Sequence, residues 1–140
     1  MPNSFQFELV SPEKLVLSKQ AALVNVPGGE GDYGVLAGHA PMITTVRPGV
    51  VEVFADDHGA PADRIFVAGG FAEVTNERCT VLAEQATPVT ELNAVQLEEQ
   101  AKNFAEDINL AKTHGERAAA EEQLALTKAK LQVIAGSGGH

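Results

Sequence analysis

The spacing of apolar residues changes once along this chain, near residue 88, and this change limits the possible folds more than any other feature. From residue 5 to about 88, apolar and polar residues alternate, as in FQFELV, where Phe5, Phe7 and Leu9 fall on one face. Beyond ATPVT, apolar residues recur at steps of three and four. A period of two indicates β-strands, and a period near 3.6 indicates amphipathic helices. We therefore expect a β-domain over residues 1–88 and a helical segment after it.

The first part contains about eight or more short strand-like runs. Turn-forming segments such as SPE, RPG and AGG separate these runs. No helical pattern lies between successive runs, so a parallel sheet built from βαβ units is excluded. An antiparallel sandwich or barrel remains.

The second part predicts an antiparallel helical hairpin over residues 89–135, followed by a flexible tail over 136–140. The first helix is expected from about Glu91 to Lys112, and THG then supplies a glycine suited to a helix end. The second helix carries its own stripe at the same spacing, namely Ala120, Leu124, Thr127, Leu131 and Ile134. Because only Phe104 is large in the two stripes, the hairpin buries little apolar area.

Charge and cysteine content exclude several classes of function. The 140 residues carry a net charge of −9, which repels a phosphate backbone and argues against nucleic acid as a partner. The single cysteine, Cys79, lies in the apolar run CTVLA, is expected to be a core residue, and fits a reducing compartment. No run approaches the roughly 20 apolar residues of a membrane span, and MPNSFQFELV lacks the features of a signal peptide.

The glycine-rich stretch NVPGGEGDYGVLAGHAP, residues 25–41, is the most unusual segment. It lacks the lysine of a P-loop, and it leads into strand rather than into the helix of a dinucleotide fold. Its glycines allow a sharply shaped connection, while Tyr33, Val35 and Leu36 are apolar anchors. We interpret it as an exposed acidic loop that contacts another protein, in preference to a purely structural loop.

Other chemical motifs are absent. The four histidines, which include His58 and His140, lack the spacing of a metal site. Asp56 and Asp57 are expected in a solvated turn, and Glu98 precedes Lys102 by four residues as an exposed ion pair. No active site or cofactor site is recognised. The chain is therefore not expected to be an enzyme by itself, and an enzymatic alternative would depend on residues such as His39 or Asp32.

Four segments together closely resemble the epsilon subunit of bacterial F-type ATP synthase. They are VSPEKLVLS, VPGGEGDYGVLAGHAPMITTVRPGVV, IFVAGGFAEVTNERCTVLAEQA and the helical hairpin ending in AKLQVIA. The most specific piece is the pattern PG-x-x-G-x-x-G-x-L-x-x-HAP. The resemblance implies a flattened β-sandwich followed by two antiparallel helices, in a non-catalytic subunit of the central stalk at the cytoplasmic face of the bacterial inner membrane.

The resemblance also implies partners, namely the gamma subunit and the ring of membrane c subunits, whose rotation is passed to the stalk. Glu30 and Asp32 are expected to face the ring, and His39 is expected near gamma or in a purely structural role. Contact area is expected from apolar neighbours. The docking residues predicted in this way are Glu30, Asp32, Tyr33, Val35, Leu36, His39, Pro41 and Met42.

In relatives, the hairpin can extend along gamma to the alpha and beta subunits and block ATP hydrolysis. Some members bind ATP at a Leu/Ile-Asp-x-x-Arg-Ala motif, for which LEEQAK, residues 97–102, is the corresponding segment. Here Leu97 is followed by Glu98 in place of Asp, by Ala101 in place of Arg and by Lys102 in place of Ala. Loss of the arginine removes a charge-assisted phosphate contact, which argues against ATP binding. A nucleotide-sensing module is nevertheless the alternative function.

Overall fold

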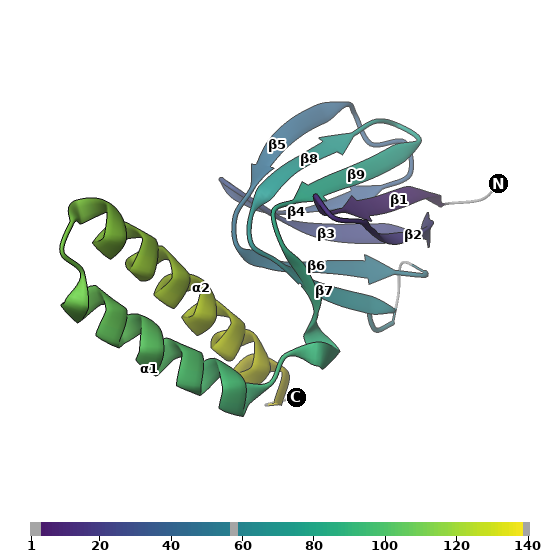
Figure 1. The fold of residues 1–140 in the computed structure, drawn as a ribbon. Coiled ribbons are helices and arrows are strands. Elements are labelled where there is room, and N and C mark those ends of the chain that lie inside the picture. The colour runs from purple at the N-terminus through teal and green to yellow at the C-terminus, as the bar shows by residue number, and fades with distance from the viewer. Residues whose placement is uncertain (1–3, 57–58, 139–140) are drawn as a thin grey trace. The chain divides into compact units, whose positions relative to one another are not determined.

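The computed structural model describes residues 4–56 and 59–138. The chain divides into two compact units, Met1–Thr90 and Glu91–His140. The first is made of strands and the second of two helices (Figure 1). A β-sandwich followed by a helical hairpin is therefore confirmed as the fold class. Asp57, which was expected in a turn, and the histidines His58 and His140, which lack the spacing of a metal site, lie outside the described residues.

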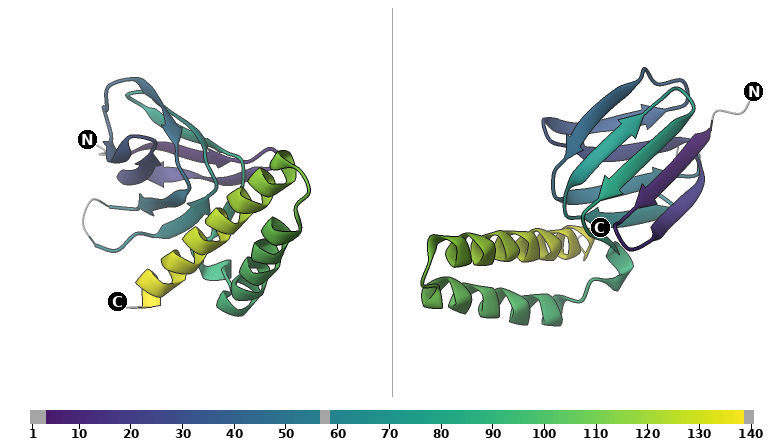
Figure 2. Two further views of the ribbon diagram at one scale, coloured as in Figure 1. Left: turned by 90° about the vertical axis from the view of Figure 1, so that its left-hand side faces the viewer. Right: turned by 45° about the horizontal axis from the view of Figure 1, so that its top comes forward.

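The described residues of the first unit form ten strands, which are joined in one hydrogen-bonded sheet. The strands are β1 (Phe5–Val10), β2 (Leu15–Ala21), β3 (Leu23–Gly28), β4 (Gly31–Leu36), β5 (Met42–Val46), β6 (Gly49–Phe54), β7 (Asp63–Val67), β8 (Gly70–Val74), β9 (Arg78–Ala83) and β10 (Ala86–Pro88). Their order is β10-β7-β6-β3-β5-β8-β9-β1-β2, with β4 paired to β3. The sheet folds over on itself, so that β3, β6 and β7 lie opposite β5, β8 and β9 (Figures 1 and 2).

Residue alternation explains the core between these layers. Phe7 and Leu9 of β1 are fully buried, while the residues between them are partly exposed. Strands β6, β8 and β9 show the same alternation. Val and other β-branched residues fit such a pleated surface, and burying each large side chain contributes roughly 1.5–3 kcal/mol. The sandwich is therefore held by a continuous apolar core.

One strand pair departs from the antiparallel pattern. β1 pairs with β9 in parallel, from Gln6 opposite Arg78 to Val10 opposite Leu82, whereas the other pairs are antiparallel. The lack of helical patterns between the strand-like runs excludes only parallel strands that are joined by helices. Here the two strands are joined by the remainder of the sandwich, so a parallel pair arises without a βαβ unit.

The helical unit consists of α1 (Ala94–Leu110) and α2 (His114–Gly138), preceded by a 3₁₀ turn at Val89–Glu91. Asn93 is the N-cap of α1, because its side-chain oxygen accepts a hydrogen bond from the backbone N–H of Gln96 at 3.0 Å. At the turn between the helices, the Thr113 hydroxyl accepts from the N–H of Glu116 at 3.0 Å. These caps fix where each helix begins.

The helix bounds differ from the predicted ones. α1 begins at Ala94 rather than at Glu91, because Asn93 caps it, and it ends at Leu110 rather than at Lys112. α2 continues to Gly138, so residues 136–138 of the expected tail are helical. Residues 139–140 lie outside the described part of the chain.

Candidate docking surface

The glycine-rich stretch is a β-hairpin rather than a long loop, which corrects the interpretation from sequence. β3 and β4 pair from Leu23 opposite Leu36 to Gly28 opposite Gly31, leaving two residues at the tip. A Cβ atom on Gly28 would lie 2.6 Å from the carbonyl oxygen of Gly31 and 2.8 Å from the Tyr33 ring. Close packing across the hairpin therefore accounts for this glycine, which the sequence pattern had suggested was needed for loop shape.

The two acids of the hairpin occupy different environments. Glu30 lies at the exposed tip and has no hydrogen-bond or ion-pair partner among the described residues. The Asp32 side chain on β4 is also exposed, but its carboxylate accepts a hydrogen bond from the Arg47 guanidinium. The structure thus keeps both acids at the surface and, of the two, leaves only Glu30 unpaired.

Tyr33 joins the hairpin to β5. Its hydroxyl and that of Thr44 are 2.5 Å apart, and the side chain is half-buried. Burial raises the pKa of Tyr33, while its hydrogen bond with Thr44 acts in the opposite direction. Tyr33 therefore remains a neutral phenol that anchors the hairpin, as an apolar anchor was expected to do.

Val35 is not available for docking. Its side chain is 1% exposed and belongs to the apolar core, because it points inward on the strand that carries it. The prediction that it supplies contact area is therefore wrong. Its neighbour Leu36 points outward and is 53% exposed. Pro41 is exposed and Met42 is half-buried, so these two residues remain at the surface as predicted.

His39 lies in the connection after β4 and is half-buried. Its Nδ1 is 2.7 Å from the carbonyl oxygen of Ala40. Because a carbonyl oxygen only accepts, Nδ1 carries the proton and Nε2 is left as an acceptor in the neutral ring. This local hydrogen bond fits a structural role and also leaves Nε2 for a partner, so both roles considered for His39 stay open.

An apolar row on the outer face of the sandwich was not predicted from the sequence. Phe71 on β8 and Leu82 on β9 are directly opposite each other and are 56% and 53% exposed. Leu82 is in turn opposite Val10 of β1, and Val10 is opposite Leu15 of β2. Leu15 is 56% exposed, and Ile43 on the neighbouring strand β5 is 71% exposed.

A depression follows this apolar row. It is lined by Val10, Ser11, Pro12, Gly70, Phe71, Leu82, Ala83 and Glu84. Contiguous exposed apolar side chains of this kind mark sites of protein contact more often than isolated ones do. The period-two alternation of β8 and β9 could have revealed the row, because Phe71 and Leu82 occupy positions where a solvated strand carries polar residues.

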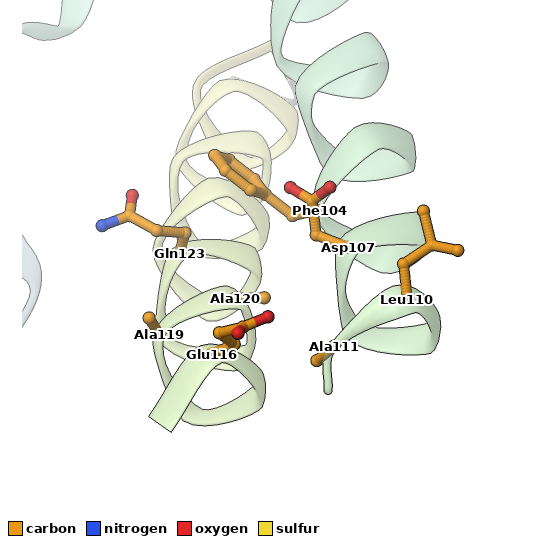
Figure 3. Close-up of a pocket in the computed structure, with 8 residues that line it drawn as sticks. All are labelled: Phe104, Asp107, Leu110, Ala111, Glu116, Ala119, Ala120 and Gln123. Carbon is orange, nitrogen blue, oxygen red and sulfur yellow. The ribbon is translucent and has the colours of Figure 1, made fainter. Parts of the chain in front are cut away.

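The helical unit contains a pocket of its own, at the end where α1 turns into α2 (Figure 3). Phe104 of α1 points toward α2, whereas Leu110 points away from it (Figure 3). The lining residues are Phe104, Asp107, Leu110, Ala111, Glu116, Ala119, Ala120 and Gln123. Two of these are carboxylates and none is a cation, so this pocket is unsuited to the phosphates of a nucleotide.

The residues assigned to the ATP motif lie on α1. Leu97 is buried, and Glu98 and Lys102 are exposed. A related pattern occurs at residues 92–97, where the N-cap Asn93 stands for Asp and Gln96 stands for Arg. Either alignment lacks the arginine that would contact a phosphate.

Other chemical groups in the described residues give no catalytic site. Burial raises the pKa of the Cys79 thiol to about 12, so this side chain is an inert core residue, as predicted. No group of three or more His, Cys, Asp or Glu residues suited to a metal ion occurs within residues 4–56 and 59–138.

Comparison with known sequences gives matches along nearly the whole length of the protein. Residues 4–89 match the family described as ATP synthase, Delta/Epsilon chain, beta-sandwich domain, and residues 94–140 match the family described as the C-terminal domain of the ATP synthase epsilon chain. The ATP synthase epsilon chain of Rhodospirillum centenum is 52% identical over 138 residues, which span 96% of this chain and 94% of the relative. That of Paramagnetospirillum magneticum is 49% identical over 135 residues, which span 96% and 100%.

Comparison with solved structures gives the same fold. One match is in the mitochondrial ATP synthase of Euglena gracilis, in an OSCP/F1/c-ring assembly, with a TM-score of 0.80 at 22% identity over 96% of this chain and 83% of that chain. Another is in the central stalk and c-ring structure of the Tetrahymena thermophila mitochondrial ATP synthase, with a TM-score of 0.66 at 15% identity over 91% and 94% of the two chains.

Proposed function

The chain belongs to the epsilon-chain family of ATP synthases, and from this membership we propose that it is a central-stalk subunit of the rotor that couples c-ring rotation to ATP synthesis. By its family it is a non-catalytic subunit of the ATP synthase complex. In the proposed arrangement, the sandwich binds the gamma subunit and rests on the c ring. Rotation of the ring then reaches gamma through a rigid β-domain.

The outer apolar row is the observation that carries the proposed binding to gamma. Phe71, Leu82 and Leu15 would bury their exposed area against a partner, and apolar area removed from water contributes about 25 cal/mol per Å². Aromatic side chains near the centre of an interface commonly contribute the most binding energy. Phe71 is the aromatic residue of this row, and it is flanked by Thr45 and Leu82 in the sheet.

The tip of the β3–β4 hairpin is the surface that we assign to the c ring. Glu30 is exposed there without a partner among the described residues, and the charged rim of an interface mainly sets association rate and registry. Leu36, Pro41 and Met42 remain as neighbours that add contact area. His39 is assigned to the boundary with gamma.

We assign the subunit to the cytoplasmic face of the bacterial inner membrane, as a peripheral part of the complex. Within the described residues, neither helix has the combination of length and apolar character needed to span a membrane. The helical unit is the proposed regulatory part. Its separation from the sandwich as a second compact unit supports a role in which it contacts the alpha and beta subunits and limits ATP hydrolysis.

Co-elution with purified gamma subunit on a sizing column tests the main proposal. We expect a one-to-one complex, and we expect Phe71→Glu to weaken it by about tenfold or more, because a charge would be buried in an apolar contact. Val95→Glu is the matched control, since Val95 is 74% exposed but lies on α1. Absence of a complex at micromolar concentration would contradict the proposal and would favour the nucleotide-sensing alternative.

A further inference from the structure

Arg47 contacts both strands of the hairpin from the turn between β5 and β6. Its backbone N–H donates to the carbonyl oxygen of Pro27 at 2.9 Å. Its guanidinium donates through Nη1 to the carbonyl oxygen of Gly28 at 2.5 Å and through Nη2 to the Asp32 carboxylate. Gly28 ends β3 and Asp32 lies near the start of β4. One side chain therefore bridges the two strands beside the tip.

The tip is held from other directions as well. The backbone N–H of Gly29 donates to the carbonyl oxygen of Thr45 at 2.9 Å, and the hydroxyl groups of Tyr33 and Thr44 are 2.5 Å apart. A Cβ atom on Gly29 would lie 2.2 Å from the Thr45 hydroxyl oxygen. The hairpin end thus lies close against β5, and Glu30 extends from a tip with little freedom to move.

These contacts give the two hairpin acids different roles. Asp32 is engaged by Arg47 within the chain, and its charge is compensated there. Glu30 keeps an unpaired carboxylate that can accept hydrogen bonds from a cationic or N–H group of a partner. The Arg47 and Asp32 side chains are 44% and 71% exposed, and so exposed a pair contributes little to the stability of the fold.

We propose that Arg47 is a positioning residue for docking: by bridging Gly28 and Asp32 it fixes the direction of Glu30, which alone of the two acids meets the partner. This inference rests on the proposed function, which assigns the hairpin tip to the c ring. Arginine suits this task because its planar guanidinium reaches two acceptors at once, whereas the lysine ammonium is a single point charge on a flexible stem.

The test is a double-mutant cycle on the affinity of the gamma complex, meaning this chain bound to the purified gamma subunit, for detergent-solubilised c ring. The affinity is measured over a series of KCl concentrations. The variants are Glu30→Gln, Arg47→Ala and the double variant. We expect each single change to weaken ring binding by about fivefold and to reduce its salt dependence. The double variant is expected to bind no more weakly than Glu30→Gln alone, because Arg47 acts through Glu30.

Two further variants keep the result interpretable. Arg64→Ala removes another cross-strand arginine–carboxylate pair of the sandwich, in which Arg64 lies 3.2 Å from Glu52, and it is expected to leave ring binding unchanged. Arg47→Lys retains the charge and serves if Arg47→Ala does not fold. It is expected to bind more weakly than the unchanged protein, since one of the two contacts is lost.

The outcomes separate the inference from the proposed function. If the unchanged gamma complex fails to bind the ring, the proposed function fails and the inference fails with it. If that complex binds but Arg47→Ala binds equally well, the inference alone is overturned. The inference would also be overturned if the loss of ring affinity in the double variant were the product of the losses in the two single variants. It would be overturned too if Arg64→Ala lost as much ring affinity as Arg47→Ala, because Arg47 would then act on the sandwich in general.

Discussion

Gly70 is a single residue on whose missing side chain the strand β8 depends. Its φ is +141°, and an added Cβ would lie 1.9 Å from the backbone carbonyl oxygen of Leu82 on the neighbouring strand β9. The backbone of the neighbouring strand cannot give way as the end of a flexible side chain can. The glycine is therefore required by close approach and by conformation together.

We expect Gly70→Ala to destabilise the sandwich by roughly 2 kcal/mol or more, because it adds both backbone strain and a steric clash. Denaturant unfolding followed by far-UV circular dichroism measures this cost. Gly34→Ala is the control in the same sheet, since its added Cβ would meet only side-chain atoms, at 3.3 Å. Equal losses of unfolding free energy in Gly70→Ala and Gly34→Ala would contradict the explanation given for Gly70.

Cys79 is a residue whose burial is detectable by titration. Its pKa is raised to about 12 in the folded chain from an ordinary value near 9.0, because burial disfavours the thiolate. The folded state therefore binds the proton more tightly than the unfolded state does. This contribution to stability is complete below about pH 9 and is lost as the pH rises toward 12.

We accordingly expect Cys79 to resist a thiol reagent at pH 8 in the folded chain and to react once the chain is unfolded. The measurement is the rate of labelling with and without denaturant. A rate in the folded chain close to that of a free thiol would show that the side chain is accessible, contrary to its burial.

At the scale of elements, the helix ends depend on side chains that the sequence alone did not identify. Asn93 begins α1, and at the turn before α2 the hydroxyl of Thr113 and the carboxylate of Glu116 both accept backbone hydrogen bonds. This second arrangement follows the T-x-x-E pattern of a capping box. Apolar spacing predicted both helices, but it does not locate their first residues.

Asn93→Ala is expected to lower the stability of the helical unit by about 1 kcal/mol, because the N–H of Gln96 loses its acceptor. Asn103→Ala is the matched control, since Asn103 is exposed in the interior of α1, where alanine favours the helix. Helix content, followed during thermal unfolding of the full-length protein, measures the change in stability that each of the two substitutions causes. The two identical substitutions should shift stability in opposite directions, and a shift in the same direction would contradict the capping role.

The elements also show what the sequence could predict. The alternation of Phe5, Phe7 and Leu9 gave the strand and its inward face correctly, because burial on one side follows directly from a period of two. Composition misled at residues 25–41, because Gly28 and Gly29, which close packing requires, have the appearance of loop glycines in the sequence. Partnership over long sequence distance, as between Val10 and Leu82, follows from topology and has no local signature.

At the scale of the whole molecule, the two units differ in how much apolar side-chain area they bury. The sandwich has many fully buried large side chains, whereas among the described side chains of the helical unit the buried residues are Leu97, Ala120 and Thr127. Small side chains remove little apolar area from water when they are buried. Most of the stability of helices in proteins comes from packing of an apolar face rather than from helix propensity, and this unit buries little of such a face. The two units should therefore differ in their capacity to fold alone.

We expect a fragment of residues 1–90 to unfold cooperatively, and a fragment of residues 91–140 to be only partly helical at about 25 °C. Circular dichroism and amide hydrogen exchange on the two fragments measure this difference. A cooperative, strongly protected helical fragment would contradict the expectation, and so would a sandwich fragment without a sharp transition.

The parallel pairing of β1 with β9 has a consequence for synthesis. β1 leaves the ribosome before the other strands of the sandwich, but its partner β9 is made only after the strands β2 to β8 have been made. Until then β1 is paired with β2, while the N–H and C=O groups of its other edge have no strand beside them. Another polypeptide could pair with that edge, so the nascent protein is exposed to such pairing until residue 83 has been made.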